Sequence, residues 1–228
     1  MHITKFSELP QAMQNSEVRR YYDILKHKNK ALLAKRCMDL IICSIVTIIA
    51  SPFILLFAIL IKLTSKGPVL FKQQRVGKDM KPFHILKFRT MIKDADKKGV
   101  QLTTGNDARI TKFGKFLRAI NMDEMPQLFN VLRGDMSIIG TRPEVKRYVD
   151  IYTDEMLATL LLPPGMLSLA SVKYKDENAM LDGAEDPQKV YIEKILPDKM
   201  KYNLEYMQKL SLKEDFKLIG KSIACMFH

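Results

Sequence analysis

The longest apolar segment of the chain runs from Leu40 to Ile61, about 22 residues without a charged side chain. A helix of this length can cross the hydrocarbon core of a bilayer, which is about 30 Å thick. Ser51 and Pro52 lie at its middle, where proline removes a backbone hydrogen bond and disfavours helix at the preceding residue. Basic residues flank both ends, so the positive-inside rule assigns no sidedness. Two topologies stay open, a kinked helix that spans the bilayer and a helix–break–helix hairpin with both ends on one face.

Three charged residues mark the N-terminal edge of this segment. We expect Lys35, Arg36 and Asp39 to lie at the level of the lipid headgroups, where charged side chains extend toward water. We also expect Ser51 to hydrogen-bond a backbone group that Pro52 leaves free. These expectations place the start of the apolar segment at a membrane surface.

The rest of the pattern predicts an α+β fold that is mostly helical. Apolar runs at Val69–Phe71 and Phe83–Phe88 surround a turn-like Gly77–Asp79, which is typical of a β-hairpin. Residues 93–105 form a polar stretch and predict a loop, and Pro197 is expected to separate two helices. Helical composition or periodicity covers Glu17–Lys30, Ile110–Ile120, Val145–Leu162, Asp186–Leu196, Asp198–Leu210 and Leu212–Phe227.

The C-terminal segment is amphipathic. Its apolar residues recur at helical spacing, with lysines on the other side: Leu212, Phe216, Ile219, Ile223 and Phe227. Such a stripe packs either against a protein core or into a membrane interface. An apolar face of this kind would also allow a homodimer.

Composition narrows the classes of partner. The 228 residues carry a net charge of +12, which favours nucleic acid, an anionic membrane or a phosphorylated substrate as partner. The sequence has no helix-turn-helix, zinc-finger or RNP-type pattern, so we expect no nucleic acid. Its three cysteines form no CxxC pair and its four histidines do not cluster, so we expect neither a disulfide framework nor a His/Cys metal site.

Two adjacent carboxylates, Asp123 and Glu124 (the dyad), precede a short apolar helical segment. Pro126 suits the first turn of that helix and Gly134 its C-terminal cap. A helix N-terminus would hold such a carboxylate ionised, and an ionised carboxylate can attack a phosphoryl group while its neighbour binds Mg²⁺. The ordinary alternative is a capping aspartate beside a solvated glutamate.

Basic residues gather around the dyad in sequence. Lys87 and Arg89 flank Phe88 in a predicted strand, Arg118 precedes the dyad, and Arg142 follows it. A carboxylate nucleophile facing a diphosphate needs nearby cations, and arginine matches phosphate oxygens in bidentate fashion. Taken singly each is more often a surface charge, but their clustering favours an anion-binding site.

These motifs occur in one order that resembles the bacterial sugar transferases of the monotopic phosphoglycosyl transferase family, in its small, single-domain form. The resemblance covers roughly residues 33–224. It rests on Lys35-Arg36 with Asp39, Ser51-Pro52, Gly67–Gly77, Lys87–Met91, Asp107–Thr111, Asn121–Asn130 and Arg133–Pro143.

The resemblance implies a function and a role for each site residue. A sugar phosphate would pass from a UDP-sugar to polyprenyl (undecaprenyl) phosphate with release of UMP, as the first membrane step of surface glycan assembly. Asp123 matches the nucleophile that forms a covalent phosphosugar intermediate, and Glu124 the residue that holds Mg²⁺. Lys87, Arg118 and Arg142 match positions around the phosphates and nucleotide, and Arg142 with Pro143 matches part of a uridine-binding signature.

The implied architecture is an N-terminal polar extension (1–34), a re-entrant membrane helix (35–63) and a cytoplasmic catalytic domain with interfacial helices (64–228). The active site would lie on the cytoplasmic leaflet of the bacterial inner membrane. Thr141, and the segment Leu162–Leu169, depart from the family pattern. The alternative function is a non-catalytic, membrane-anchored scaffold that binds nucleotide or anionic lipid.

Overall fold

The computed structural model describes residues 1–92, 95, 107–174, 180–181, 183 and 185–226, and these form a mostly helical α+β fold, as predicted. The predicted loop at 93–105 lies largely outside the described residues. The helices are α1 Ser16–Lys26, α2 Asn29–Thr64, α3 Lys112–Ala119, α4 Gln127–Arg133, α5 Lys146–Val149, α6 Leu169–Lys173, α8 Pro187–Val190, α9 Leu196–Lys209 and α10 Leu212–Met226. The strands are β1 Leu70–Val76, β2 Pro82–Phe88, β3 Ser137–Ile139 and β4 Gly165–Leu167.

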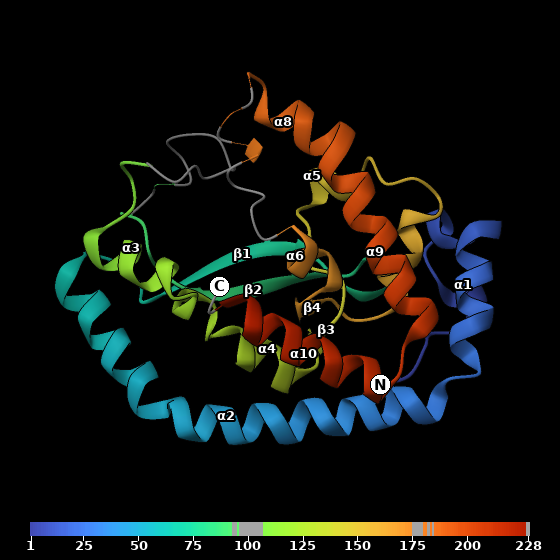
Figure 1. The fold of residues 1–228 in the computed structure, drawn as a ribbon, viewed down its shortest axis with the longest axis horizontal. Coiled ribbons are helices and arrows are strands. Elements are labelled where there is room, and N and C mark those ends of the chain that lie inside the picture. Colours follow the sequence, from blue (N-terminus) through green and yellow to red (C-terminus); the bar gives the residue numbers. More distant parts are fainter. Residues whose placement is uncertain (93–94, 96–106, 175–179, 182, 184, 227–228) are drawn as a thin grey trace.

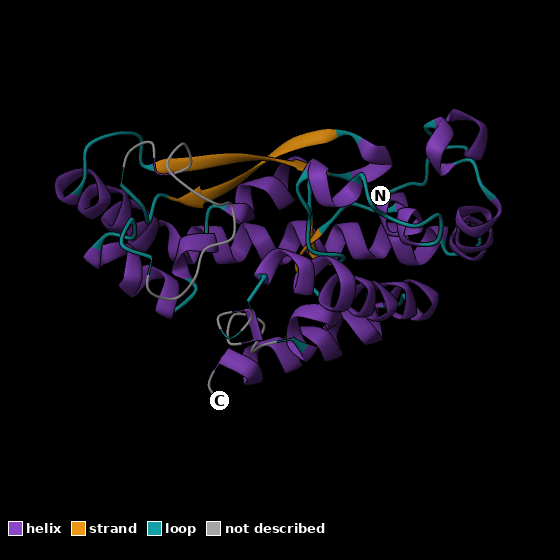
Figure 2. Ribbon diagram, turned by 90° about the horizontal axis from the view of Figure 1, so that it is seen from above, coloured by secondary structure: helices purple, strands orange, loops and turns teal. Residues whose placement is uncertain are grey.

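The elements are arranged around the long helix α2. Figure 1 shows α2 along one side of the molecule, and α4 contacts both α2 and strand β2 of the hairpin. Seen after a quarter turn, the hairpin lies on one face and the C-terminal end on the opposite face (Figure 2). The antiparallel hairpin and the parallel β3–β4 pair form separate sheets. The hairpin is confirmed, although β1 is longer than the predicted Val69–Phe71 because it continues through polar residues.

Helix α2 is one continuous helix of 36 residues that changes direction near its middle (Figure 1). The Ser51 hydroxyl donates to the carbonyl of Ile48 at 2.8 Å, the acceptor that the missing N–H of Pro52 would otherwise use. The predicted bond from Ser51 is therefore confirmed. The helix is not interrupted at Pro52, because this bond satisfies the backbone and lets the helix bend without ending, and the re-entrant topology stays a prediction.

The apolar segment of α2 is mostly exposed. In its most apolar stretch of 18 residues only 6% of residues are buried, so α2 is no soluble core helix. The helix is long and apolar enough to cross a membrane. The exposed side chains include Ile41, Ile45, Ile48, Ile49, Phe53, Leu55, Leu56 and Ile59. A continuous apolar surface of this size indicates contact with a membrane or a protein partner.

Lys35 and Asp39 near the start of α2 are buried in protein and Arg36 is partly buried, which corrects the prediction that they lie among lipid headgroups. Lys35 is 2% exposed, and its Nζ lies 2.9 Å from Oδ2 of the fully buried Asp215 in α10. Tyr206 of α9 donates from its hydroxyl to the other Asp215 oxygen. The sequence pattern missed this pair because Asp215 is 180 residues away in the chain.

The neighbouring charges complete this attachment. Oδ2 of Asp39 accepts a hydrogen bond from Ser137 Oγ at 2.8 Å, and Oδ1 accepts one from the Ile138 N–H at 3.1 Å. Arg36 donates to the carbonyls of Val131 and Leu132 in the last turn of α4, where the helix dipole favours a cation. We refer to Lys35, Arg36, Asp39 and Asp215 as the docking cluster, because together they fix α2 to α4, β3 and α10.

Residues 1–34 pack into the main core. Leu9, Met13, Val18, Tyr21 and Leu25 are buried in the same hydrophobic cluster as residues of α4, β3 and α9. Asn15 caps α1 by accepting from the N–H of Val18. The apolar stripe of α1 is narrow, and it is nevertheless sufficient to place this segment in the core.

Two predicted helical boundaries are wrong. Val145–Leu162 contains only α5 and a 3₁₀ turn, Met156–Leu161, separated by irregular backbone. Pro197 does not separate helices, because α8 continues through a π-helical turn, Tyr191–Ile195, directly into α9. Pro197 lies in the first turn of α9. The preceding π turn is wider, so the N–H that proline lacks is not needed there.

The predicted apolar stripe of α10 is divided between the core and the surface. Ile219 is partly buried against the main hydrophobic cluster, whereas Phe216 and Ile223 are exposed. The two alternatives, core packing and a membrane interface, therefore each apply to part of the stripe. Phe227, the last residue of the predicted stripe, lies outside the described residues.

Candidate active site

The dyad lies on a tight turn ahead of α4. Asp123 and Glu124 belong to a 3₁₀ turn that starts after Asn121, a residue with left-handed backbone (φ 55°). Helix α4 begins only at Gln127, and Gly134 ends it with a φ of 96°, as predicted for its cap. The dyad therefore does not occupy the first turn of α4, and adjacent cations hold its charge instead of the helix terminus.

Glu124 is the centre of an ion-pair network. Its Oε1 lies 2.6 Å from Nζ of Lys87 in β2 and 2.5 Å from Nη2 of Arg142, which follows β3. Burial alone would raise the pKa of the Glu124 carboxyl, but Arg142 and Lys87 together hold that pKa well below its ordinary value. Three elements distant in sequence thus converge on one ionised carboxylate.

Asp123 is in a different electrostatic state. Its side chain is mostly buried, and burial raises the pKa of its carboxyl, to which the charge of Glu124 adds. Lys87 and Arg118 act in the opposite direction and favour the ionised form. Two adjacent carboxyls with pKa values pushed apart are typical of a site where they have separate tasks.

Arg118 is held in place by a close approach of α3 to the chain after β2. Its Nε donates to Thr90 Oγ1 at 2.8 Å. Thr111 caps α3 by accepting from the Gly114 N–H, and a Cβ added at Gly114 would lie 2.1 Å from the Thr90 carbonyl oxygen. Only glycine permits this approach. Sequence reasoning missed Thr90 and Gly114, although Thr90 lies within a motif that carries the family resemblance.

Arg89, which is predicted to bind substrate, has its guanidinium hydrogen-bonded to the connection after α2. Its guanidinium donates to the Ser65 carbonyl and hydroxyl, both at 2.7 Å, and to the Pro68 carbonyl. Between Lys87 and Arg89, Phe88 packs edge-to-face against Phe57 of α2. Arg89 therefore ties the end of β2 to the connection after α2.

Pro143 also makes its contacts within the protein. It is buried, and its carbonyl accepts a hydrogen bond from Arg75 Nη1 at 3.0 Å. The next residue, Glu144, accepts from the Tyr191 hydroxyl at 2.6 Å and receives the N–H of Val76 on its carbonyl. The Arg142–Pro143 turn is thus fixed to β1, while the Arg142 side chain reaches Glu124.

We refer to the side chains that surround the dyad as the dyad cluster: Asp123, Glu124, Lys87, Arg118 and Arg142. Among the described residues, no group of three or more His, Cys, Asp or Glu side chains could hold a metal ion. Mg²⁺ needs fewer protein ligands, because one or two carboxylates with substrate phosphates and waters complete its shell. The ionised Glu124 fits that requirement. Gln127 follows Glu124 by three residues, and its buried side-chain Nε2 and Oε1 have no hydrogen-bond partner among the described residues.

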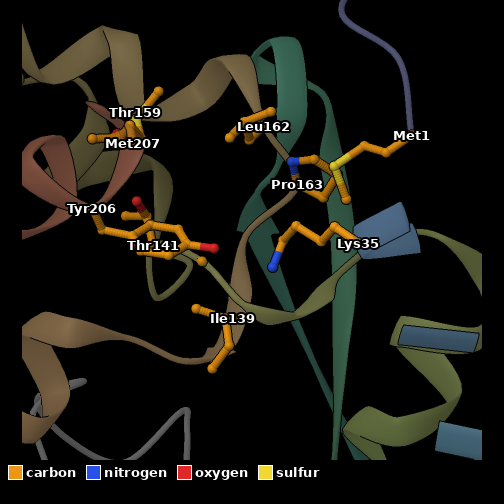
Figure 3. Close-up of a pocket in the computed structure, with 10 residues that line it drawn as sticks. Met1, Lys35, Ile139, Thr141, Thr159, Leu162, Pro163, Tyr206 and Met207 are labelled. Atoms are coloured by element: carbon orange, nitrogen blue, oxygen red, sulfur yellow. The ribbon is translucent and has the colours of Figure 1, made fainter. Parts of the chain in front are cut away.

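A small pocket is lined by Thr141, the residue before Arg142. Figure 3 shows Lys35 and Tyr206 extending toward one another there. Its volume of about 10 Å³ suits a single water molecule, far below the space a nucleotide sugar requires. Leu162 and Pro163 also line the pocket, and the Gly165 N–H donates to the Thr141 carbonyl at 2.8 Å. Thr141 and the segment Leu162–Leu169, which depart from the family pattern, are therefore neighbours in space. Thr141 directly precedes Arg142 in the chain.

Comparison with known proteins gives one consistent family. A family model described as bacterial sugar transferase matches residues 30–228. A UDP-glucose:undecaprenyl-phosphate glucose-1-phosphate transferase of Caulobacter vibrioides is 37% identical over 194 residues, 84% of this chain and 68% of the relative. One of Klebsiella pneumoniae is 37% identical over 193 residues, 82% of this chain and 39% of the relative.

A further relative differs in its sugar. A UDP-N-acetylgalactosamine-undecaprenyl-phosphate N-acetylgalactosaminephosphotransferase of Aeromonas hydrophila is 43% identical over 141 residues, 60% of this chain and 33% of the relative. The chain thus spans well under half the length of two of these relatives and about two thirds of the third. The names of these three relatives share undecaprenyl phosphate and a UDP-sugar and differ in the sugar that is transferred.

Proposed function

The chain belongs to the bacterial sugar transferase family, and on this premise we propose that it transfers a sugar phosphate from a UDP-sugar to undecaprenyl phosphate. The observation that carries the proposal is the dyad cluster, in which one carboxyl is held ionised by two cations and its neighbour lies beside them. Both substrates are anionic, which suits a chain of net charge +12.

Asp123 is the nucleophile in this proposal. One of its carboxylate oxygens attacks the phosphorus that carries the sugar, and the bond from that phosphorus to the UMP oxygen breaks, so UMP leaves with the electron pair. A phosphate oxygen of undecaprenyl phosphate then attacks the same phosphorus and restores the Asp123 carboxylate. The covalent route divides one displacement into two easier steps.

The cations supply binding and charge stabilisation. Lys87 and Arg118 favour ionised Asp123, the form that can attack. Arg142 has the planar geometry that matches phosphate oxygens, and we assign it, with Lys87, to the diphosphate. Arg89 and Pro143 have no direct substrate contact in this proposal, because both serve the connections that support the site.

We assign Mg²⁺ binding to Glu124. When bound, the ion would neutralise charge on the diphosphate and on the leaving UMP. Glu124 is suited to this because Lys87 and Arg142 keep its carboxylate ionised. Among the described residues no such pair of cations is bonded to Asp123, and its carboxylate attacks when Lys87 and Arg118 offset the effect of burial on its pKa.

The exposed apolar surface of α2 supports a site at a membrane surface. We propose that α2 enters the inner membrane and returns to the same, cytoplasmic, leaflet. Its bend at Ser51 and Pro52 supports this topology, and so does the protein attachment of both ends, through the docking cluster and through Phe57 against Phe88. A lipid-linked phosphate acceptor would then reach the dyad from the bilayer surface.

The test is a UMP-release assay on the purified protein in lipid nanodiscs. UDP-glucose and UDP-N-acetylgalactosamine are supplied with undecaprenyl phosphate and Mg²⁺, and we expect UMP release with one of them. Absence of release across a broad UDP-sugar panel would contradict the proposal and favour a binding scaffold. Labelling of a cysteine introduced before Lys35 and another after Thr64 tests the topology, and we expect both to be accessible from the same side.

A further inference from the structure

Asn130 lies in α4 and is completely buried, and its side-chain hydrogen bonds go to residues outside the dyad cluster. Its amide Nδ2 donates to the His84 carbonyl at 2.8 Å, and its Oδ1 accepts from the Leu86 N–H at 2.9 Å. Nδ2 also donates to Asp135 Oδ2 at 3.2 Å. All three bonds are of good length, so the carboxamide has one fixed orientation.

The two backbone groups that Asn130 binds belong to an open sheet edge. His84 and Leu86 are two residues apart in β2, so their backbone groups point to the same side of the strand. Among the described residues the sheet consists of two strands, and β1 covers the other edge of β2. The Asn130 side chain therefore takes the place of a neighbouring strand, and it joins α4 to β2.

This junction lies between the two halves of the ion-pair network. Lys87 follows Leu86 directly in β2, and Glu124 precedes α4 by a short turn. That turn is hydrogen-bonded throughout, because the N–H groups of Met125, Leu128 and Phe129 each reach the carbonyl three residues earlier. Movement of β2 relative to α4 would change the distance between Lys87 and the dyad.

The backbone of Asn130 is fixed as well. Its carbonyl accepts from the N–H groups of Gly134, Asp135 and Met136 at the end of α4. Asn130 thus accepts the hydrogen bonds that end α4, and its side chain binds the edge of β2 in one fixed orientation. A residue needed only for burial in the core would not require this set of polar partners.

We propose that Asn130 is a positioning residue, which sets the contact of Lys87 with Glu124 and Asp123 by clamping the free edge of β2 to α4. The inference rests on the proposed function of the dyad. Misplacement of a catalytic group by about 1 Å can reduce turnover about 100-fold. Loss of the clamp therefore acts through Lys87.

The test is a double-mutant cycle of Asn130→Ala and Lys87→Ala, measured as kcat/KM for UMP release per folded protein. We expect Asn130→Ala to lower kcat/KM about 10- to 100-fold in the wild-type background. In the Lys87→Ala background we expect a further loss of less than about threefold, because the contact being positioned is already absent. Losses that multiply in the double variant would overturn the proposal.

A matched control separates positioning from stability. Asn203 of α9 is also buried, and its amide donates to Met200 Sδ at 3.6 Å, away from the dyad. We expect Asn203→Ala to lower the thermal midpoint while kcat/KM per folded protein stays within about threefold. An equal loss of kcat/KM in both variants would identify the effect of Asn130→Ala as structural.

Hydrogen exchange tests the clamp without any assay of activity. The Leu86 amide lies on an open edge and should nevertheless exchange slowly in the wild type, because Asn130 accepts from it. It should exchange faster in Asn130→Ser. This variant has a smaller polar side chain and is measured in case the alanine variant does not fold. Rapid exchange in the wild type would contradict the clamp, whereas an inactive wild type with a protected Leu86 would contradict only the proposed function.

Discussion

The docking cluster and the dyad cluster are built from the same kinds of charged residue and differ in how they are satisfied. In the docking cluster, the Lys35 and Asp215 side chains are 2% and 0% exposed and paired within the protein. In the dyad cluster, the Lys87 and Glu124 side chains are each 22% exposed, and the carboxylates are adjacent in the chain. Buried charges with complete sets of partners hold a fold together, whereas accessible charges that oppose one another's ionisation are typical of chemistry.

Four substitutions or pH changes test this contrast. If it is correct, changes in the dyad cluster reduce turnover and leave folding nearly intact. Changes in the docking cluster should do the reverse.

The largest effect is expected for Asp123→Asn. The amide has nearly the same shape as the carboxylate and cannot act as the nucleophile, so we expect turnover to fall by about 1,000-fold or more. UMP release measures turnover, and circular dichroism with thermal melting checks that the variant is folded. Undiminished turnover would remove Asp123 from the mechanism.

The next effect is on stability, from Lys35→Met. Removing one partner leaves Asp215 charged and buried, which typically costs about 3–5 kcal/mol. We expect a large drop in the thermal midpoint and turnover per folded protein within about threefold of the wild type. Because Lys62 is an exposed lysine at the other end of α2, Lys62→Met is the matched control. A large loss of turnover without a change in melting would mean that the docking cluster belongs to the active site.

A smaller effect is expected for Arg118→Ala, and it depends on pH. Arg118 favours the ionised form of Asp123, so its loss should raise the pKa of that carboxyl further. Because the ionised form attacks, the acid side of the kcat profile should move to higher pH, with about a tenfold loss near neutral pH. Arg109→Ala gives a comparison within the same segment. A uniform loss at every pH would assign Arg118 to substrate binding alone.

The smallest effect is expected for the contribution of ionised Glu124 to the thermal stability of the protein. Its folded pKa is held below the ordinary value of 4.5, so its ionised form stabilises the protein above that pH, and this contribution disappears as pH falls below about 4.5. The wild type should therefore lose more thermal stability between pH 6 and pH 3 than Glu124→Gln. Parallel losses in the two proteins would show that the ion pairs at Glu124 do not stabilise the fold.

Local patterns were sufficient for some elements and not for others. The β-hairpin, α3 and the Gly134 cap follow from turn residues, periodicity and backbone geometry, and the structure has them. The positions of Lys35 and Asp39 did not follow, because the apolar run after them indicated lipid whereas their partners come from α10 and β3. Long-range pairing decides such cases, and a single sequence does not display it.

The candidate site shows the same division. The nearness of Lys87, Arg118 and Arg142 to the dyad agrees with their clustering in the sequence. Arg89 belongs to the same run of residues, and its guanidinium binds the Ser65 carbonyl instead. Asn130 lies within the dyad motif, but only the packing of α4 on β2 reveals what its amide does.

The most direct test of the central claim is to trap the covalent intermediate. The protein is incubated with Mg²⁺ and UDP-glucose or UDP-N-acetylgalactosamine in lipid nanodiscs that contain no undecaprenyl phosphate, and its peptides are then analysed by mass spectrometry. We expect up to one equivalent of UMP per protein, with a sugar phosphate attached to the peptide at Asp123. UMP release that strictly requires the lipid acceptor, with no adduct at Asp123, would contradict it.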